Sequence, residues 1–310
     1  MLALVILSSL VLEVAACFAI AAHLAARGWD VPALLGLALA WVLGTRLLLV
    51  GFSMATSHRE RSPRSPDQQL GPAGTLKLVL GEWAAMLRSN FVMLPFERFI
   101  VRRDAPLARS GRIPVLLVHG YLSNRGLFRS VIRSLEDAGV QPLVTHNFER
   151  LLAPIESWAD ELEAIVRDVV ARTGQPKVIF VCHSMGGLVV RSYVSRHGAS
   201  RVAKLVTIAS PHHGTLAASR GVGHNARQMR RESEFLAALA GKEGVQGQGY
   251  PATSIYSVHD NLVVPQDTSR LPWARNVALS GVGHVAILRW GALHRALIEE
   301  LREAGALPAR

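Results

Sequence analysis

The chain has 310 residues, of which half are hydrophobic and only 18% are charged. This length accommodates one membrane segment and one substantial α/β domain, and most of the apolar excess lies in the first 55 residues. The net charge of +11 favours contact with an anionic surface, either nucleic acid or anionic lipid. Because the sequence has no helix-turn-helix, zinc-finger or aromatic RNA-binding pattern, we expect lipid contact and no nucleic-acid partner. The two cysteines, Cys17 and Cys182, lie too far apart to indicate a disulfide or a metal cluster.

Two apolar runs, residues 2–26 and 33–55, are each long enough to cross about 30 Å of hydrocarbon as a helix. The short turn RGWDVP joins them, and the basic stretch SHRERSPRSP follows. Basic residues favour the cytoplasmic side, so we predict a two-span hairpin over residues 1–56 in a bacterial inner (cytoplasmic) membrane, with the remaining chain in the cytoplasm. The alternative is a signal anchor and a buried helix, which would place that chain in the periplasm.

Two charged residues, Glu13 and Arg46, interrupt these apolar runs at similar distances from the turn. An antiparallel hairpin would set both side chains at the same depth, and an ionisable group in hydrocarbon is costly without a partner. We therefore predict a Glu13–Arg46 ion pair. The alternative is that each side chain faces another subunit or reaches the membrane surface, and the sequence does not indicate an oligomeric state.

Residues 57–110 are expected to form a linker followed by an amphipathic helix. The stretch 59–74 is rich in Ser, Pro and Gly, which is typical of a linker. Apolar side chains then recur at helical spacing: Leu76, Leu80, Trp83, Leu87 and Phe91. This helix either lies on the bilayer surface or packs on the domain that follows.

Residues 111–310 alternate strand-like and helix-like segments, which predicts an α/β fold with a mostly parallel, doubly covered sheet. The strand-like segments are 113–120, 141–148, 177–184, 203–211, 253–260 and 274–281. Residues 157–174 form an amphipathic helix that Gly174 is expected to stop, and a last helix is expected within 285–305.

The stretch VCHSMGG, residues 181–187, matches the nucleophile pattern G-x-S-x-G except that Cys182 replaces the first Gly. A strand that ends at His183 and a helix that starts near Met185 would leave Ser184 on a sharp turn. Side chains alternate along a strand, so His183 is expected to point away from Ser184. Cys182 is expected to be buried and to pack rather than react. Ser184 is therefore the predicted nucleophile.

A nucleophilic serine needs a base and an orienting acid, which follow it in this kind of fold in the order acid, then His. His284, in the Gly-flanked stretch LSGVGHVAIL, is the predicted base, whereas His294 lies inside the last helix and is expected to be exposed. Asp260, at the end of a predicted strand, is the predicted acid, with Asp267 as the second choice. A turn-forming role beside Asn261 is the alternative for Asp260.

The oxyanion formed on attack requires fixed N–H donors. The backbone N–H of Met185, directly after the nucleophile, is one candidate. The backbone N–H of Tyr121 is the other, since Gly120 allows the chain to bend at that point. His119 is expected to be a buried residue that braces this loop.

Five stretches in order, VLLVHGYLSN, CHSMGGLVVR, IASPHHGT, HDNLVVPQDTSRL and ARNVALSGVGHVAIL, resemble the signature blocks of bacterial triacylglycerol lipases and esterases of the α/β-hydrolase fold. The resemblance covers about residues 110–305. It implies Ser184, Asp260 and His284 as the triad, with Tyr121 and Met185 as oxyanion donors. Cys182 departs from the pattern, although some bacterial lipases carry Ala there. Some family members bind calcium near the triad, but no matching acidic set occurs here, so neither metal nor cofactor is expected.

Residues 216–249 form an insertion longer than a simple connection. Within it, ARQMRRESEFLAALAG, residues 226–241, is expected to be one amphipathic helix. The resemblance suggests a lid over the acyl pocket that opens at a lipid surface. The alternative is a fixed structural cap.

These features predict a membrane-anchored serine hydrolase that cleaves carboxylic esters, in particular lipid-like acyl esters. An acyltransferase or thioesterase with the same triad is the nearest alternative. A non-catalytic membrane scaffold that retains the fold is the alternative from another class.

Overall fold

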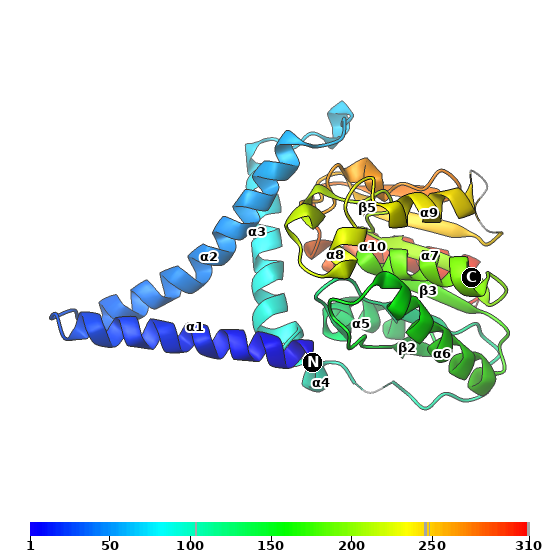
Figure 1. Ribbon diagram of the computed structural model, residues 1–310, viewed down its shortest axis with the longest axis horizontal. Helices are drawn as coiled ribbons and strands as arrows, with labels where there is room; N and C mark the ends of the chain where they lie inside the picture. The colour runs from blue at the N-terminus through cyan, green and yellow to red at the C-terminus, as the bar shows by residue number, and fades with distance from the viewer. Residues whose placement is uncertain (103, 245–246, 248, 309–310) are drawn as a thin grey trace.

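A six-stranded parallel sheet forms the centre of the C-terminal part of the computed structural model, which describes residues 1–102, 104–244, 247 and 249–308 (Figure 1). The strand order is β2-β1-β3-β4-β5-β6, and every neighbouring pair is parallel. The strands are β1 (Val115–Val118), β2 (Leu143–Thr145), β3 (Val178–His183), β4 (Val202–Ile208), β5 (Ala252–Ser257) and β6 (Arg275–Leu279). The α/β prediction is confirmed.

Helices cover both faces of this sheet, because the central strands are apolar on both sides. On one face pack α5 (Arg129–Asp137) and α10 (Gly291–Glu303), and on the other pack α6 (Ile155–Thr173) and α7 (Met185–His197). Alternate residues of β1 belong to the two cores, with Leu117 in the first and Leu116 in the second. Gly174 ends α6 with φ 72°, so the predicted helix stop is confirmed.

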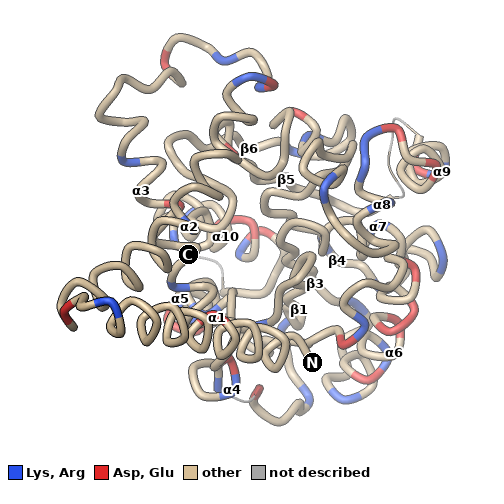
Figure 2. The backbone as a smooth tube through the Cα atoms, turned by 60° about the vertical axis from the view of Figure 1, so that its left-hand side comes forward, with Lys and Arg blue, Asp and Glu red and all other residues tan. Residues whose placement is uncertain are grey.

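The N-terminal helices α1 (Leu2–Ala25) and α2 (Val31–Arg59) extend away from the sheet and meet at a turn distant from it (Figure 1). Asp30 caps α2 by accepting a hydrogen bond from Ala33 N at 2.8 Å. Figure 2 shows that charged residues gather on the sheet domain and after α2, whereas most of α1 is uncharged. Both helices are long and apolar enough to cross a bilayer, a test that a signal sequence near the N-terminus also passes.

The predicted ion pair between these helices is present. Arg46 contacts Glu13 through both terminal nitrogens, with Nη2 at 2.5 Å from Oε2. The Arg46 guanidinium also lies 5.1 Å from the centre of the Phe91 ring. The pair therefore joins α1 and α2, and the arginine extends the contact to the segment that follows α3.

The predicted amphipathic helix is α3 (Pro72–Arg88), which continues into a π-helical turn (Ser89–Met93) and the short α4 (Glu97–Ile100). It packs alongside α2, where Trp83 Nε1 donates to Leu43 O at 3.1 Å. Its buried residues are Leu78, Glu82 and Ala85. Leu76 and Leu80 of the predicted apolar face are exposed instead. Helix α3 therefore packs on the rest of the chain through a face that includes the Glu82 carboxylate, while Leu76 and Leu80 stay on the surface.

The insertion after β4 is built differently from the prediction. A single helix over residues 226–241 is wrong, because the chain forms η4 (Leu216–Arg220), α8 (His224–Gln228) and α9 (Glu234–Glu243). Glu232 has φ 62°, and Ser233 starts α9 by accepting a hydrogen bond from Leu236 N. This left-handed residue and new N-cap break the predicted helix. Residues 245–246 and 248 of the predicted insertion lie outside the described residues.

Helix α9 is anchored to the core. Arg191 of α7 and Glu243 form a bidentate ion pair with distances of 2.8 and 2.7 Å, and both side chains are almost completely buried. Leu236 and Leu239 of α9 belong to the same core as α7. In this structure α9 therefore packs on the core. The described residues of the insertion that line the cavity described below lie in η4 and α8 and directly beside them.

Candidate active site

Ser184 occupies the sharp turn between β3 and α7 with φ 55° and ψ −127°, a strained conformation for a residue with a side chain. The turn brings the start of α7 very close to neighbouring segments, which leaves no room for side chains at the two glycine positions that follow Met185. A Cβ on Gly186 would lie 2.3 Å from Val118 O, and one on Gly187 would lie 2.5 Å from Ser210 Oγ. Both positions therefore require glycine, and the serine hydroxyl is presented at the end of the sheet.

The two reactive side chains before Ser184 are buried. Cys182 has no exposed surface, and burial raises the pKa of its thiol well above the ordinary value, so it packs as a neutral group. His183 Nε2 donates to His284 O at 3.2 Å, and burial lowers the pKa of His183 well below the ordinary value. His183 thus supports the loop of His284, which the sequence did not indicate.

Asp260 and His284 meet at the carboxyl ends of β5 and β6. His284 Nδ1 lies 2.9 and 3.1 Å from the two Asp260 carboxylate oxygens. Asp260 Oδ1 also accepts the backbone N–H groups of Leu262 and Val263, both at 2.8 Å. Burial acts to lower the pKa of His284, but the charge and hydrogen bond of Asp260 outweigh it and raise the pKa above 6.5.

Ser184 and His284 both line one cavity of about 450 Å³. No hydrogen bond joins their side chains among the described residues, and such bonds often tighten only when a substrate is bound. The cavity wall is largely apolar and comes from α2, α3, the loop after β1 and the insertion. Its apolar residues include Leu49, Met86, Leu94, Leu127, Met229 and Val263. A long apolar group could therefore lie beside the serine.

The second-choice residues lie elsewhere. Asp267 is exposed in η5 (Gln266–Ser269), where its backbone N–H donates to Ser62 Oγ. His294 is half-buried in α10, and its Nε2 donates to Leu288 O at 2.9 Å. The predicted exposure of His294 is wrong, because its ring caps this carbonyl group.

The loop after β1 lies directly against the serine turn. A Cβ on Gly120 would lie 2.8 Å from Ser184 Cβ and 3.3 Å from Met185 N. The Tyr121 hydroxyl both donates to and accepts from the backbone of Val222, at 2.8 and 3.1 Å, which ties the loop to the insertion. The backbone N–H groups of Tyr121 and Met185 have no acceptor in the part of the chain that the structure describes. Both remain available to a ligand.

His119 braces this loop, as predicted. Its Nδ1 donates to Gly120 O at 3.0 Å, and its Nε2 accepts the backbone N–H of Phe148 at 3.1 Å. These partners define a neutral tautomer, and burial lowers the pKa of His119 to about 4. His119 is therefore a structural residue of the site.

Glu82 of α3 is a residue of the site that the sequence analysis missed. Its carboxylate is completely buried and accepts the backbone N–H groups of Val285 and Ala286, each at 2.9 Å. These two residues follow His284 directly, so Glu82 holds the loop that carries the imidazole. Burial raises the pKa of Glu82. The only signal in the sequence is one carboxylate in the apolar run TLKLVLGEWAAML.

Two serines of α2 were also missed. Ser57 Oγ donates to Asp260 O at 2.7 Å. Ser53 Oγ accepts from Asn261 Nδ2 at 2.9 Å, and Asn261 Oδ1 accepts the backbone N–H of His284 at 3.0 Å. The last two turns of α2 therefore hold the loops of both Asp260 and His284.

Comparisons with known proteins match part of the chain to this fold. Residues 113–232 match a family described as the alpha/beta hydrolase fold. A stretch of 114 residues is 34% identical to a triacylglycerol lipase of Pseudarthrobacter phenanthrenivorans and covers 34% of each chain. A stretch of 102 residues is 27% identical to the lysosomal thioesterase PPT2-B of Xenopus laevis and covers 32% of this chain and 35% of that protein.

Among solved structures, lipase B of Aspergillus fumigatus superposes with a TM-score of 0.57 at 20% identity, over 65% of this chain and 55% of that one. This likeness shows the fold. The chain spans about a third of the length of the relatives that it matches in sequence.

Proposed function

We propose that this chain, a member of the α/β hydrolases by its fold, is a membrane-anchored serine hydrolase that cleaves carboxylic esters of lipid-like acyl chains. The observation that carries the proposal is the hydrogen-bonded Asp260–His284 pair, which opens onto the same apolar cavity as the strained Ser184. The likeness to a triacylglycerol lipase supports the same reaction class.

In the proposed mechanism, Ser184 attacks the ester carbonyl while His284 Nε2 accepts its proton. Asp260 keeps the imidazole in the correct tautomer and stabilises its positive charge. The backbone N–H groups of Met185 and Tyr121 stabilise the oxyanion. The protonated His284 then gives its proton to the departing alcohol. Water activated by His284 hydrolyses the acyl-enzyme, which releases the acid and restores the serine.

The membrane anchor consists of α1 and α2, placed as a hairpin in an inner (cytoplasmic) membrane. The basic residues after α2 favour a cytoplasmic location for the enzyme domain. Because Leu49 of α2 and Met86 of α3 line the cavity, an acyl chain can enter it from the bilayer side. We assign residues 1–56 to the hairpin, 57–110 to the linker and α3 region, and 111–310 to the hydrolase domain.

Hydrolysis of p-nitrophenyl butyrate and p-nitrophenyl palmitate by the purified full chain tests the proposal. Ser184→Ala should abolish activity above background, because it removes the nucleophile. Cys182→Ala is the matched control, since this neighbouring thiol is buried, and its activity should stay close to that of the unchanged protein. A folded protein that is inactive on both esters, or that loses its activity only with Cys182→Ala, would contradict the proposal.

A thioesterase is the second candidate, favoured by the likeness to a lysosomal thioesterase. The same triad would attack a thioester, and no feature of the described cavity distinguishes the two leaving groups. Comparing palmitoyl-coenzyme A with p-nitrophenyl palmitate separates the two activities. Transfer of the acyl group to an added alcohol, detected as a new ester, would instead indicate an acyltransferase.

A further inference from the structure

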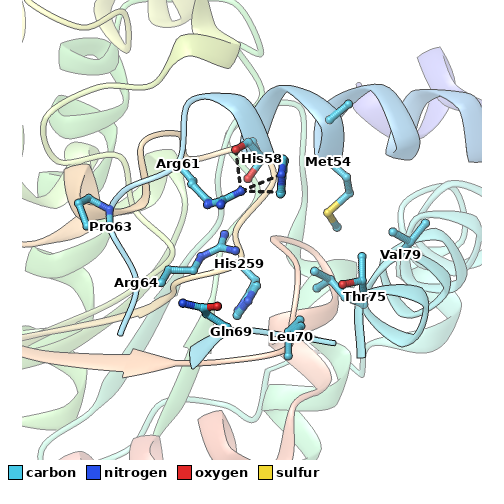
Figure 3. A pocket seen from close by; sticks show the side chains of 13 residues that line it. Met54, His58, Arg61, Pro63, Arg64, Gln69, Leu70, Thr75, Val79 and His259 are labelled. Carbon is cyan, nitrogen blue, oxygen red and sulfur yellow. Dashed lines mark hydrogen bonds between the residues drawn. The ribbon is translucent and has the colours of Figure 1, made fainter. Parts of the chain in front are cut away.

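A second cavity, of about 680 Å³, lies where α2 ends, between the segment after α2, the start of α3 and the loop after β5 (Figure 3). It is lined by the guanidinium groups of Arg61 and Arg64 and by the imidazoles of His58 and His259. Figure 3 shows these four side chains grouped on one side of the cavity. None of them takes part in the proposed ester hydrolysis.

The cavity carries positive charge that no carboxylate balances. No acidic residue lines it, and neither Arg61 nor Arg64 forms an ion pair with any described residue. Arg64 is half-buried, and its Nε donates to Val258 O at 2.8 Å. Burial and the charge of Arg61 lower the pKa of Arg64.

His259 adds a buried donor with no partner. It is 3% exposed, and its Nδ1 accepts the backbone N–H of Gly281 at 3.1 Å. The ring proton of the neutral imidazole must therefore be on Nε2, and this atom is buried without a hydrogen-bond partner among the described residues. His259 therefore lies in the cavity wall with one polar ring atom that the described residues leave unpaired.

We propose that this cavity binds the phosphate group of an anionic phospholipid. Two guanidinium groups and a neutral N–H donor match the charge and oxygens of a phosphate. The cavity lies directly beyond the apolar length of α2, where lipid headgroups would be in the proposed membrane-anchored enzyme, on which this inference rests. Met54, Leu78 and Val79 give it an apolar side that suits a lipid better than a free phosphate ion.

The bound headgroup would contact the loop of the proposed catalytic acid. His259 directly precedes Asp260, and Arg64 holds the carbonyl group of Val258. Occupation of the cavity would therefore stabilise the end of β5, from which Asp260 reaches His284.

Calorimetric titration of the full chain in uncharged detergent micelles tests this site. The Ser184→Ala background prevents turnover, so the result is independent of whether the protein hydrolyses esters. Dihexanoyl phosphatidylglycerol is expected to bind saturably and more tightly than inorganic phosphate. Arg64→Gln should weaken binding about tenfold, the effect of losing one charge-assisted hydrogen bond. Arg61→Gln should also weaken binding. Because Arg61 is exposed, this variant tests the site even if Arg64→Gln does not fold.

Arg59→Gln is the matched control, because it removes the same charge from the last residue of α2 but lies outside the cavity lining. Its affinity should equal that of the background protein. Equal weakening by Arg59→Gln would mean attraction to general surface charge and would overturn the site. Equal affinity for inorganic phosphate would overturn the lipid assignment, and the absence of saturable binding would overturn both.

Discussion

At the scale of single residues, the position of the proposed base, His284, depends on other groups in addition to the proposed acid, Asp260. His284 contacts the Asp260 carboxylate through Nδ1, its carbonyl oxygen accepts from His183, and Glu82 holds the two amides that follow it. The charges of Asp260 and Glu82 both raise the pKa of His284. Since the base must be neutral to accept a proton, activity should be lost as the pH falls through this raised pKa, above pH 6.5.

Glu82→Gln should therefore lower kcat/KM about ten- to a hundredfold, because displacement of a catalytic group by about 1 Å costs on the order of a hundredfold. It should also shift the acidic midpoint of the kcat/KM profile to lower pH, since a negative charge near His284 is removed. Measurement of kcat/KM for an activated ester from pH 5 to pH 9 checks both effects.

Glu299→Gln, at an exposed position of α10, is the control for this change and should leave the profile unmoved. A loss of activity in Glu82→Gln with an unmoved midpoint would indicate that Glu82 only supports the fold. Glu82→Asp should recover part of the shift, because it retains the charge.

At the scale of elements, the Glu13–Arg46 pair supplies the side-chain hydrogen bonds between α1 and α2 among the described residues. The two side chains are 18% and 14% exposed, and Arg46 also lies over the Phe91 ring. A charge that loses its partner in an apolar environment is costly, whereas removal of both charges is much less so. The pair should therefore behave as one unit.

Arg46→Leu should destabilise the hairpin by about 3 kcal/mol, because it leaves Glu13 without a partner. The double variant Glu13→Leu/Arg46→Leu should recover most of this loss. Thermal unfolding of the full chain in detergent micelles, followed by circular dichroism, checks the cycle. Additive effects of the two single changes would mean that the side chains do not interact.

At the scale of the whole molecule, the cavity of the candidate active site is assembled from parts of the chain that are distant in sequence. Leu49 comes from α2, Met86 from α3, Met229 from the insertion, and Ser184 and His284 from the ends of strands. Arg220 of the insertion also lies 5.1 Å from the Phe52 ring of α2. Helix α2 thus lines the cavity that holds Ser184 and His284 and is also part of the proposed anchor.

Leu49→Trp should lower kcat/KM for a palmitoyl ester about tenfold more than for a butyryl ester. The larger side chain would fill part of the proposed acyl cavity, which a long acyl chain needs more than a short one. Leu48→Trp is the control, since this neighbour is 74% exposed and does not line the cavity. Equal losses on both esters, or the same selectivity change in Leu48→Trp, would contradict a role of α2 in the acyl site.

The sequence predicted those parts of the fold that depend on local patterns. Strands ended by glycine, the helix stop at Gly174 and the serine turn all follow from hydrophobic periodicity and the conformational freedom of glycine. It also predicted that Glu13 and Arg46 would meet, because two residues at equal distances from the turn of an antiparallel hairpin lie at the same depth in the membrane. The prediction of one helix over residues 226–241 was wrong, because the amphipathic pattern continues across the break at Glu232 and Ser233.

The sequence by itself therefore determined the α/β architecture and the candidates Ser184, Asp260 and His284, since chain order and strand ends follow from local patterns. Only the tertiary structure decided that Glu82, Ser53 and Ser57 hold the loops of the acid and base, and that α2 lines the cavity. These contacts join residues about 200 positions apart. No local pattern encodes such pairing, because it depends on which helix faces pack together after the chain has folded.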